Sequence, residues 1–453
     1  MTGLLHHLSA DRSCLAWFFL AIIGSALLAP GLLWPLLIAA GALGIAFLAW
    51  RHLSGFCVAW LLLAGLTLEM TLNDLIDPSA YAATIAVVKA AQLALGVLCM
   101  LRYGPLPDPF NPAWAFVVMF AMGFVHGLHP GLTPADSLRS LAGSVAPFVF
   151  CFSRLSPGWA QAMIQAARWI PLLSVAGGAA LDLAGLRPLF IESGGERLAG
   201  LGHPAFLAGV CLTAVYACLI RLYRDGRRGD LVLLGVNLLL LLLTGARAPL
   251  AYGAAVTALT LAFVSSPSMP ARWRWLLLLG AATLLPLLVL FGDTLSDMRL
   301  FNVLTSDSTN PSGRNLLWPA FEQAAAGASW LGWGVGAGNV IIPRDSDVAQ
   351  LLHTWAAHNE YLRIEVEGGQ VGRALLIGAF ALWAIRHTGR LPRAERRIMR
   401  LIFVAFAAHA ATDNVLISTP ACVLFSFVAA VFAGAPAARV APSSGLPEAT
   451  ALA

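Results

Sequence analysis

One stretch of the chain, "HTWAAHNEYLRIEVEGGQVG" at residues 353–372, gathers His, Asn, Glu, Tyr and Arg in a sequence that otherwise consists of apolar runs. Its pattern predicts a helix from about 358 to 367. This helix should end at Gly368 and Gly369, because glycine is common directly after the last residue of a helix. The polar cluster would then stand directly before the next apolar run.

His358 is the side chain in this stretch that could do chemistry. On the predicted helix, the spacing i, i+3, i+4 and i+7 places four side chains on one face: His358, Tyr361, Leu362 and Glu365. A histidine at a helix start is largely neutral at pH 7 and can take a proton from a hydroxyl, which makes it a candidate general base. A lone histidine is also often structural, and Asn359 and Glu360 could equally be helix-capping groups.

Three arginines on the side expected to face outward form a second candidate group. Arg197 lies in "GGERLAGLGHP", Arg247 in "LLLLLTGARAPLAYG" and Arg314 in "NPSGRNLLW". Guanidinium binds phosphate in a bidentate manner, and the neighbouring glycines let a phosphate approach the backbone. Each arginine could instead reach past the apolar surface to water or pair with one of four acids: Glu192, Glu196, Asp307 and Asp345. Together they favour a pyrophosphate at the outer leaflet.

The composition indicates a polytopic membrane protein. Of the 453 residues, 59% are hydrophobic and 11% are charged, against about 25% charged in soluble proteins. A span of about 30 Å of hydrocarbon takes roughly 20 helical residues, and the chain must satisfy its backbone hydrogen bonds within helices. We therefore predict an all-α bundle of 12–14 transmembrane helices, from apolar runs near 14–29, 31–50, 55–72, 83–101, 113–127, 140–152, 168–184, 204–222, 230–244, 248–264, 273–291, 371–386, 399–416 and 420–434.

The basic residues follow the orientation that these helices would have. Lys and Arg number 28 against 23 acidic residues, and from an inside N-terminus they gather in the loops predicted to be cytoplasmic, as the positive-inside rule requires. These are Arg51, Arg102, "RLYRDGRRGD" (221–230), "ARWRW" (271–275) and "RHTGRLPRAERRIMR" (386–400). Orientation therefore accounts for the net charge of +5, and no nucleic-acid partner is needed. The first apolar run lacks a cleavage site and is expected to be retained.

The chain is expected to have four parts. Residues 1–291 would form transmembrane helices with short loops, and 371–434 the last transmembrane helices. Between them, 292–370 would be one large periplasmic loop that carries the chemistry and folds as short helices on the bundle, because it is rich in Trp, Leu and Ala with helical spacing. The Pro, Ala and Ser content of 435–453 is typical of a disordered cytoplasmic tail.

No metal or cofactor is expected. His353 and His358 lie five positions apart, unlike the pair in a zinc motif, and the cysteines show no paired spacing. "GWGVGAG" (332–338) has Ala337 where a dinucleotide loop needs its last glycine, so we interpret it as a flexible turn. "GARAPLAYG" lacks the ending of a phosphate loop for ATP.

The order of these motifs from about 190 to 420 resembles the O-antigen ligase and polymerase superfamily of bacterial membrane glycosyltransferases. The resemblance rests on an "R-x-x-G…HP" segment (Arg197 to Pro204), the "T-G-A-R-A" turn, "G-R-x-x-L-W" (Gly313 to Trp318), "G-x-G-x-G", "H-N-E-Y-L" with "E-G-G-x-x-G", and a late "D-N" at Asp413. It implies a GT-C-like bundle in the bacterial inner membrane, with its active site facing the periplasm.

The resemblance also implies a reaction and roles for individual residues. A glycan would pass from undecaprenyl pyrophosphate to an acceptor hydroxyl, such as that of a lipid A core oligosaccharide, without metal or cofactor. The donor pyrophosphate would be held by Arg197, Arg247 and Arg314. His358 would activate the acceptor for inverting attack, and Asn359 and Tyr361 would orient the acceptor or His358. Asp413 would support an Arg or His, or else cap the loop.

Several alternatives remain open at this point. Within the superfamily, a ligase, an O-antigen or exopolysaccharide polymerase, and a protein O-oligosaccharyltransferase share these motifs. The single large outer loop slightly favours the ligase. A lipid-glycan transporter is a different class, but it would place polar groups at the membrane midplane rather than at one surface. Lys89 falls within an apolar run, where an internal partner or a snorkelling position is favoured over a contact with the donor.

Overall fold

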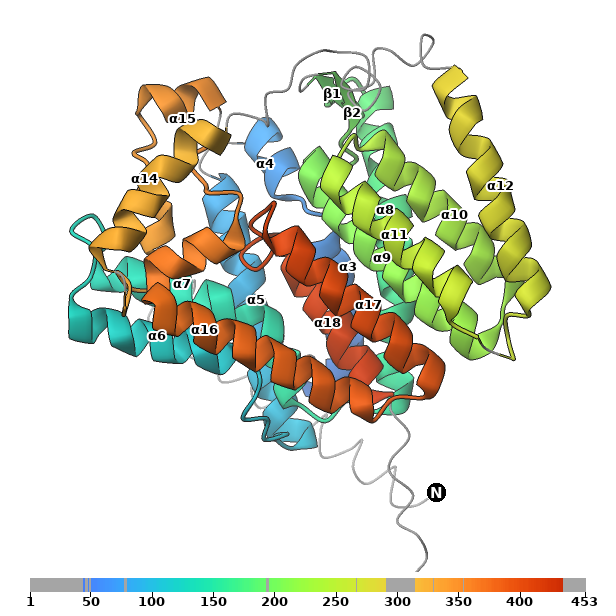
Figure 1. Ribbon diagram of the computed structural model, residues 1–453, viewed down its shortest axis with the longest axis horizontal. Coiled ribbons are helices and arrows are strands. Elements are labelled where there is room, and N and C mark those ends of the chain that lie inside the picture. Colours follow the sequence, from blue (N-terminus) through green and yellow to red (C-terminus); the bar gives the residue numbers. More distant parts are fainter. Residues whose placement is uncertain are drawn as a thin grey trace, which may run out of the picture. The chain divides into compact units, whose positions relative to one another are not determined.

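The computed structural model (Figure 1) describes residues 44, 48, 50–76, 80–192, 195–265, 267–290, 314–328, 330–352 and 354–434. The expected span 14–29, nearly all of 31–50, the first part of the large loop and the expected tail 435–453 lie outside these residues. The chain divides into two compact units, residues 1–57 and 58–453. The elements that position the site belong to the second unit.

Within the described residues the chain is almost wholly helical. Its α-helices are α3 (Leu53–Gly65), α4 (Glu69–Leu75), α5 (Ala80–Tyr103), α6 (Ala113–His126), α7 (Pro134–Val145), α8 (Pro157–Leu183), α9 (Pro204–Asp225), α10 (Arg228–Leu243), α11 (Arg247–Phe263), α12 (Ala271–Leu290), α14 (Arg314–Gly327), α15 (Asp347–Leu352), α16 (Glu360–Gly389), α17 (Arg393–Ala410) and α18 (Thr419–Ala433). Two 3₁₀ helices, η2 (Ala146–Phe152) and η4 (Ala337–Asn339), and one antiparallel pair, β1 (Phe190–Glu192) with β2 (Glu196–Leu198), complete the list. The all-α expectation is confirmed for this part of the chain.

Three of these helices are long and apolar enough to cross a membrane. They are Tyr81–Tyr103, Pro204–Asp225 and Glu360–Gly389, and the bent pair α3 and α4 would make a fourth. Other apolar helices, such as α6 and α18, have 14 and 15 residues, fewer than the roughly 20 that span the hydrocarbon. The described part of the chain is therefore helical with three candidate spans, fewer than the apolar runs alone suggest.

Two expected spans are wrong as continuous helices. The run 55–72 is divided between α3 and α4, which meet at an angle of 59°, and Thr67 between them has a φ of 52°. The run 140–152 begins in α7 and continues as the 3₁₀ helix η2, which has Pro147 near its start. Because proline lacks an amide hydrogen and clashes with the preceding turn, it disfavours continuation of the α-helix.

Helix α9 is the centre of the second unit. It is buried along most of its length and packs against α8, α10, α11 and α18. Lys89, within α5, donates a hydrogen bond of 2.9 Å from Nζ to the carbonyl oxygen of Ile417 in the α17–α18 loop. The internal partner expected for this lysine is thus present.

The described part of the large loop folds as short helices. Helices α14 and α15, η4 and the first turns of α16 enclose a hydrophobic cluster made of Leu132, Leu317, Phe321, Ala325, Ala337, Ile342, Ala349, Ala357, Leu362 and Val366. Phe321 is fully buried in this cluster. The helices that the Trp, Leu and Ala pattern predicts are present at α14 and α15, whereas 330–336 and 340–346 form turns and irregular backbone.

Helix α16 is broken at Gly369, and the glycine-rich turn fills the break. Gly369 has φ 61° and ψ −165°, a backbone region that is essentially restricted to glycine. The amide of Val371 donates to the carbonyl of Trp330 at 3.2 Å instead of continuing the helix. In exchange, Gly334 N donates to the carbonyl of Glu367 at 3.0 Å. The turn expected to be flexible is therefore packed against α16.

Replacing Gly369 with alanine should destabilise the protein by about 1–3 kcal/mol, because alanine would be forced into this backbone conformation. Its Cβ would also lie 2.4 Å from the backbone of Trp330. Gly378 in the same helix is the matched control, since nothing lies within 4 Å of a Cβ there and alanine favours a helix. Thermal unfolding in detergent should show a loss for Gly369→Ala and none for Gly378→Ala. Equal effects would contradict the break.

Candidate functional site

The polar stretch that contains His358 leads into α16. Asn359 is the N-cap residue, and its side-chain oxygen accepts a hydrogen bond from the amide of Leu362 at 3.2 Å. The helix begins at Glu360, so the expected helix over 358–367 starts two residues late. His358 lies before the cap and does not share a helix face with Tyr361. The sequence Asn-Glu provides the cap, and this cap excludes His358 from the helix.

His358 has a left-handed backbone conformation, with a φ of 47°. This region is uncommon for residues other than glycine, and such strain often occurs at functional sites. The conformation turns the imidazole between two partners. Nδ1 lies 3.0 Å from Oδ1 of Asp413, and Nε2 lies 3.0 Å from Oγ1 of Thr354. About 34% of the His358 side chain and 40% of the Asp413 side chain remain exposed.

These contacts define the state of the imidazole. An ionised carboxylate can only accept hydrogen bonds, so Nδ1 of His358 carries the proton that Asp413 accepts. In the neutral ring, Nε2 is then an acceptor, and the hydroxyl of Thr354 donates to it. The Thr354 hydroxyl thus lies where an acceptor hydroxyl would lie if Nε2 of His358 removed its proton. The pair can do the chemistry that the sequence suggested for His358.

Asp413 lies in the loop between α17 and α18. Burial by itself would raise the pKa of this carboxyl group, but the hydrogen bond from His358, the charges of His358 and His409, and the amide of Asn414 lower the pKa below its usual value. The amide of Asn414 donates to Oδ1 at 2.8 Å. Asp413 should therefore remain a carboxylate throughout the neutral and mildly acidic range. Its contacts include both of the roles expected for it, that of a histidine partner and that of a cap in its own loop.

Tyr361 connects two helices rather than pointing to His358. Its hydroxyl donates to the carbonyl of Ala407 at 2.8 Å, which fixes the first turn of α16 against α17. Among the supporting residues expected from the sequence, Asn359 and Tyr361 thus each have a backbone partner. They hold the helices on which the His358–Asp413 pair depends.

A buried charged network on α16 was missed by the sequence analysis. Arg363 donates to both carboxylate oxygens of Glu360, at 2.7 and 2.8 Å, and its Nη1 lies 2.8 Å from Glu367. Glu360 also accepts a hydrogen bond from the amide of Leu416 at 3.1 Å. The network therefore attaches the α17–α18 loop, which carries Asp413, to the start of α16. The i, i+3 and i+7 spacing of Glu360, Arg363 and Glu367 is a signal in the sequence.

Two of the three candidate arginines meet at one turn. Arg197 lies in β2, is almost fully buried, and donates from Nε to the carbonyl of Thr244 at 2.8 Å. Thr244 begins the "T-G-A-R" turn that leads to Arg247, the first residue of α11. The Arg247 side chain is exposed. The structure thus brings β2 and the α10–α11 turn together, although they are about 45 residues apart in sequence.

Helix α11 and three side-chain contacts connect this turn to His358. Tyr252 lies on α11, five residues and about 7.5 Å of helix rise beyond Arg247. Its ring centroid is 5.4 Å from that of His409 on α17. His409 Nε2 in turn lies 3.9 Å from Oδ2 of Asp413, which binds His358. The start of α11, the end of α17 and the start of α16 therefore share one end of the helices.

Arg314 is the first residue of α14, and α14 packs against α16. Its side chain lies outside the described residues. Another arginine near this end, Arg187, did not stand out in the sequence. It pairs with Asp74 at 2.8 Å and donates to the carbonyls of Gly200 and Gly202 at 2.9 and 2.7 Å. Arg187 thus holds in place the "GLGHP" segment that follows Arg197.

No protein-family model matches the chain, and no curated protein matches it in sequence. The chemistry of the site therefore rests on its own geometry. Among the described residues, no three His, Cys, Asp or Glu side chains gather as metal ligands would. What the structure does assemble is a carboxylate-held imidazole in contact with a hydroxyl and, one helix away, an exposed arginine at a glycine-containing turn.

Proposed function

We propose that this protein is an O-antigen ligase-type glycosyltransferase. It moves a glycan from undecaprenyl pyrophosphate to a hydroxyl of a lipid A core oligosaccharide, at the periplasmic face of the bacterial inner membrane. The observation that carries the proposal is the His358–Asp413 pair, with Nε2 of His358 lying 3.0 Å from a hydroxyl group. Its position at the same end of the helices as Arg247 supports a site for an anionic donor.

The proposed fold is a GT-C-like bundle of 12–14 transmembrane helices. The three candidate spans support a membrane location, and the short apolar helices would complete the bundle where the bilayer is thinned or the helices are extended. The segment 292–370 is the proposed periplasmic loop, because its described residues include His358 and the start of α16.

The proposed reaction transfers one proton to His358 and exchanges one bond at the anomeric carbon. Nε2 of His358 takes the proton of the acceptor hydroxyl, whose oxygen attacks the anomeric carbon and inverts it. The bond between this carbon and the pyrophosphate oxygen breaks, and undecaprenyl pyrophosphate leaves as an anion. Fixed cations lower a barrier most where such negative charge develops. In the proposal Arg247, Arg197 and Arg314 share this role, and neither metal nor cofactor takes part.

Replacing Arg247 with alanine should lower kcat/KM for the lipid-linked donor by roughly 10- to 150-fold, the range for losing a hydrogen bond to a charged group. Arg247→Lys should lower kcat/KM by a smaller factor than Arg247→Ala. The ammonium group keeps the positive charge but cannot bind phosphate in a bidentate manner. Initial rates at varied donor concentration measure both variants. Identical rates for the alanine and lysine variants would argue against bidentate binding at this position.

Two experiments test the proposed function itself. Protein reconstituted in liposomes and given a lipid-linked glycan and lipid A core should form a glycosylated core. Movement of the glycan lipid across the membrane without product would instead indicate a transporter. In a deletion strain, absence of long surface chains together with accumulation of carrier-linked polymer is the ligase result. Single repeat units attached to the core would indicate a polymerase.

A further inference from the structure

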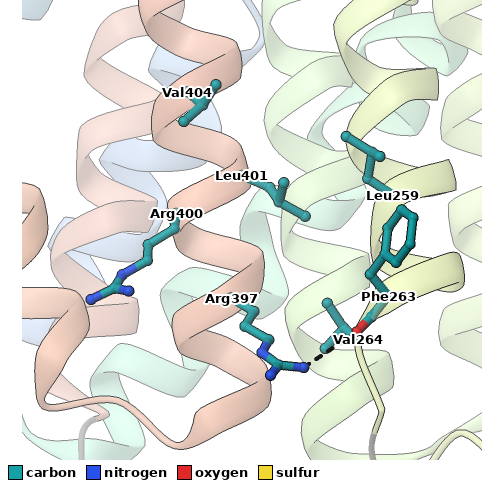
Figure 2. Close-up of a pocket in the computed structure, with 7 residues that line it drawn as sticks. All are labelled: Leu259, Phe263, Val264, Arg397, Arg400, Leu401 and Val404. Carbon is teal, nitrogen blue, oxygen red and sulfur yellow. Dashed lines mark hydrogen bonds between the residues drawn. The ribbon is translucent and has the colours of Figure 1, made fainter.

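The other end of α17 carries two arginines that the glycosyl-transfer site does not use. Arg397 and Arg400 lie three residues apart and are both exposed. Figure 2 shows that their guanidinium groups leave α17 in different directions, Arg397 toward Val264 at the end of α11 and Arg400 toward the opposite side. Arg397 donates to the carbonyl of Phe263 at 3.3 Å, and Arg400 donates to the hydroxyl of Thr388 on α16 at 3.3 Å.

An apolar groove lies on each side of α17 at this point. The groove between α11 and α17 has a volume of about 460 Å³ and is lined by Leu259, Phe263, Val264, Leu401 and Val404 together with both arginines. The groove between α16 and α17 has a volume of about 620 Å³, and its lining includes Ile377 and Phe403. Arg400 and Val404 line both grooves. A cationic ridge thus separates two apolar channels.

The positive charge on this ridge has no counterion in the described part of the chain. Neither Arg397 nor Arg400 forms an ion pair with a carboxylate there, although Arg224 nearby pairs with Glu395 at 2.6 Å. Their hydrogen bonds to a carbonyl and a hydroxyl leave the net charge uncompensated. An occupant that complements the ridge therefore has an anionic head and two apolar branches.

We propose that an anionic glycerophospholipid binds here, with its phosphate at Arg400, which lines both grooves, and one acyl chain in each groove, while Arg397 adds positive charge on the α11 side. Guanidinium groups suit phosphate oxygens, and basic pockets between helices at the membrane surface are typical sites for such head groups. Free phosphate would leave both grooves unfilled. Val404 lies about 6 Å along the helix from Arg400, which is where the two chains would diverge around α17. The phosphate end of this site lies at the opposite end of α17 from Asp413, whereas the lining of the α16–α17 groove extends to Glu360 and Tyr361.

Native mass spectrometry of the full chain in detergent tests the site, with dioleoyl phosphatidylglycerol and dioleoyl phosphatidylcholine as probes. The anionic lipid should bind in preference to the zwitterionic lipid. The double variant Arg397→Ala/Arg400→Ala should weaken binding of phosphatidylglycerol about 30-fold, or about fivefold per arginine, and remove the preference. Val404→Trp, which obstructs the grooves at the residue that lines both of them while keeping the charge, should also weaken binding.

Arg154 provides the matched control. It is an exposed arginine in the η2–α8 connection and lines neither groove, so Arg154→Ala should bind phosphatidylglycerol as the unmodified protein does. The proposal is overturned if Arg154→Ala loses as much binding as the double variant, or if both lipids bind equally. It is also overturned if inorganic phosphate at millimolar concentration displaces the lipid while Val404→Trp has no effect.

Discussion

Alanine in place of His358 should lower the rate of glycosyl transfer by about 10²- to 10⁴-fold, the usual contribution of a general base. The imidazole is held by Asp413 at 3.0 Å, and its Nε2 faces a hydroxyl group. Because His358 lies before the N-cap of α16 and is partly exposed, its loss should leave the helices folded. The measurement is product formation by reconstituted protein at saturating donor, with the unfolding temperature as the check on folding.

Two companion variants separate the base from a structural residue. In Asp413→Asn, the amide group of the asparagine can donate a hydrogen bond to Nδ1 of His358. This favours the tautomer with the proton on Nε2, which then cannot take the proton of the acceptor hydroxyl. The transfer rate of this variant should fall nearly as far as that of His358→Ala, with unchanged donor KM. Thr354→Val removes the hydroxyl that is hydrogen-bonded to Nε2 of His358. The transfer rate of this variant should stay within a fewfold of that of the unmodified protein. Normal product formation by His358→Ala would exclude it as the base.

The lowered pKa of Asp413 predicts that the effect of Asp413→Asn is independent of pH between pH 7 and pH 5. Because the carboxyl group stays ionised below its usual range, any loss of activity between pH 7 and pH 5 should not come from its protonation. Asp413→Asn should therefore lower the rate at every pH in this range by a similar factor. A rate that recovers toward the unmodified value at pH 5 would show that the charge of Asp413 matters less than proposed.

The regular part of the fold could be predicted from apolar runs alone. From residue 80 onward, α5, α9 and α18 begin and end within a few residues of the expected spans, because a long apolar run has few folded states other than a helix. The interruptions were harder to predict. Pro147 was a visible signal for the end of α7, whereas the left-handed conformation of Thr67 depends on packing that the sequence does not display.

The candidate site also has features that the sequence could predict and features that required the structure. His358 and Asp413 could be predicted from residue type and motif order, but their contact joins positions 55 residues apart and required the structure. Arg363 was overlooked because three charges at helical spacing usually mark a solvated face, and only burial distinguishes the two cases. Similarly, Gly332 looked like part of a flexible turn, yet a Cβ there would lie 2.4 Å from the backbone of α16.

Replacement of Arg363 should strongly reduce the stability of the protein. Its side chain is 4% exposed, and its partners Glu360 and Glu367 are 3% and 0% exposed. Arg363→Met would leave two carboxylates buried without their cation, and removing one partner of a buried ion pair typically costs about 3–5 kcal/mol. Thermal or denaturant unfolding in detergent should show this loss. Transfer activity should fall with it, because Glu360 also holds Leu416 in the loop that carries Asp413.

Arg373→Met is the matched control on the same helix. Arg373 pairs with Glu365 where both side chains are partly exposed, at 39% and 22%, and such surface pairs contribute about 0–1 kcal/mol. A triple variant with Glu360→Gln, Arg363→Met and Glu367→Gln should recover most of the stability, since it removes all three buried charges together. Glutamine at 360 can still accept the hydrogen bond from Leu416. If the triple variant is as unstable as Arg363→Met, the ion pairs themselves stabilise the fold. The lower stability of Arg363→Met would then not result from burying carboxylates without their cation.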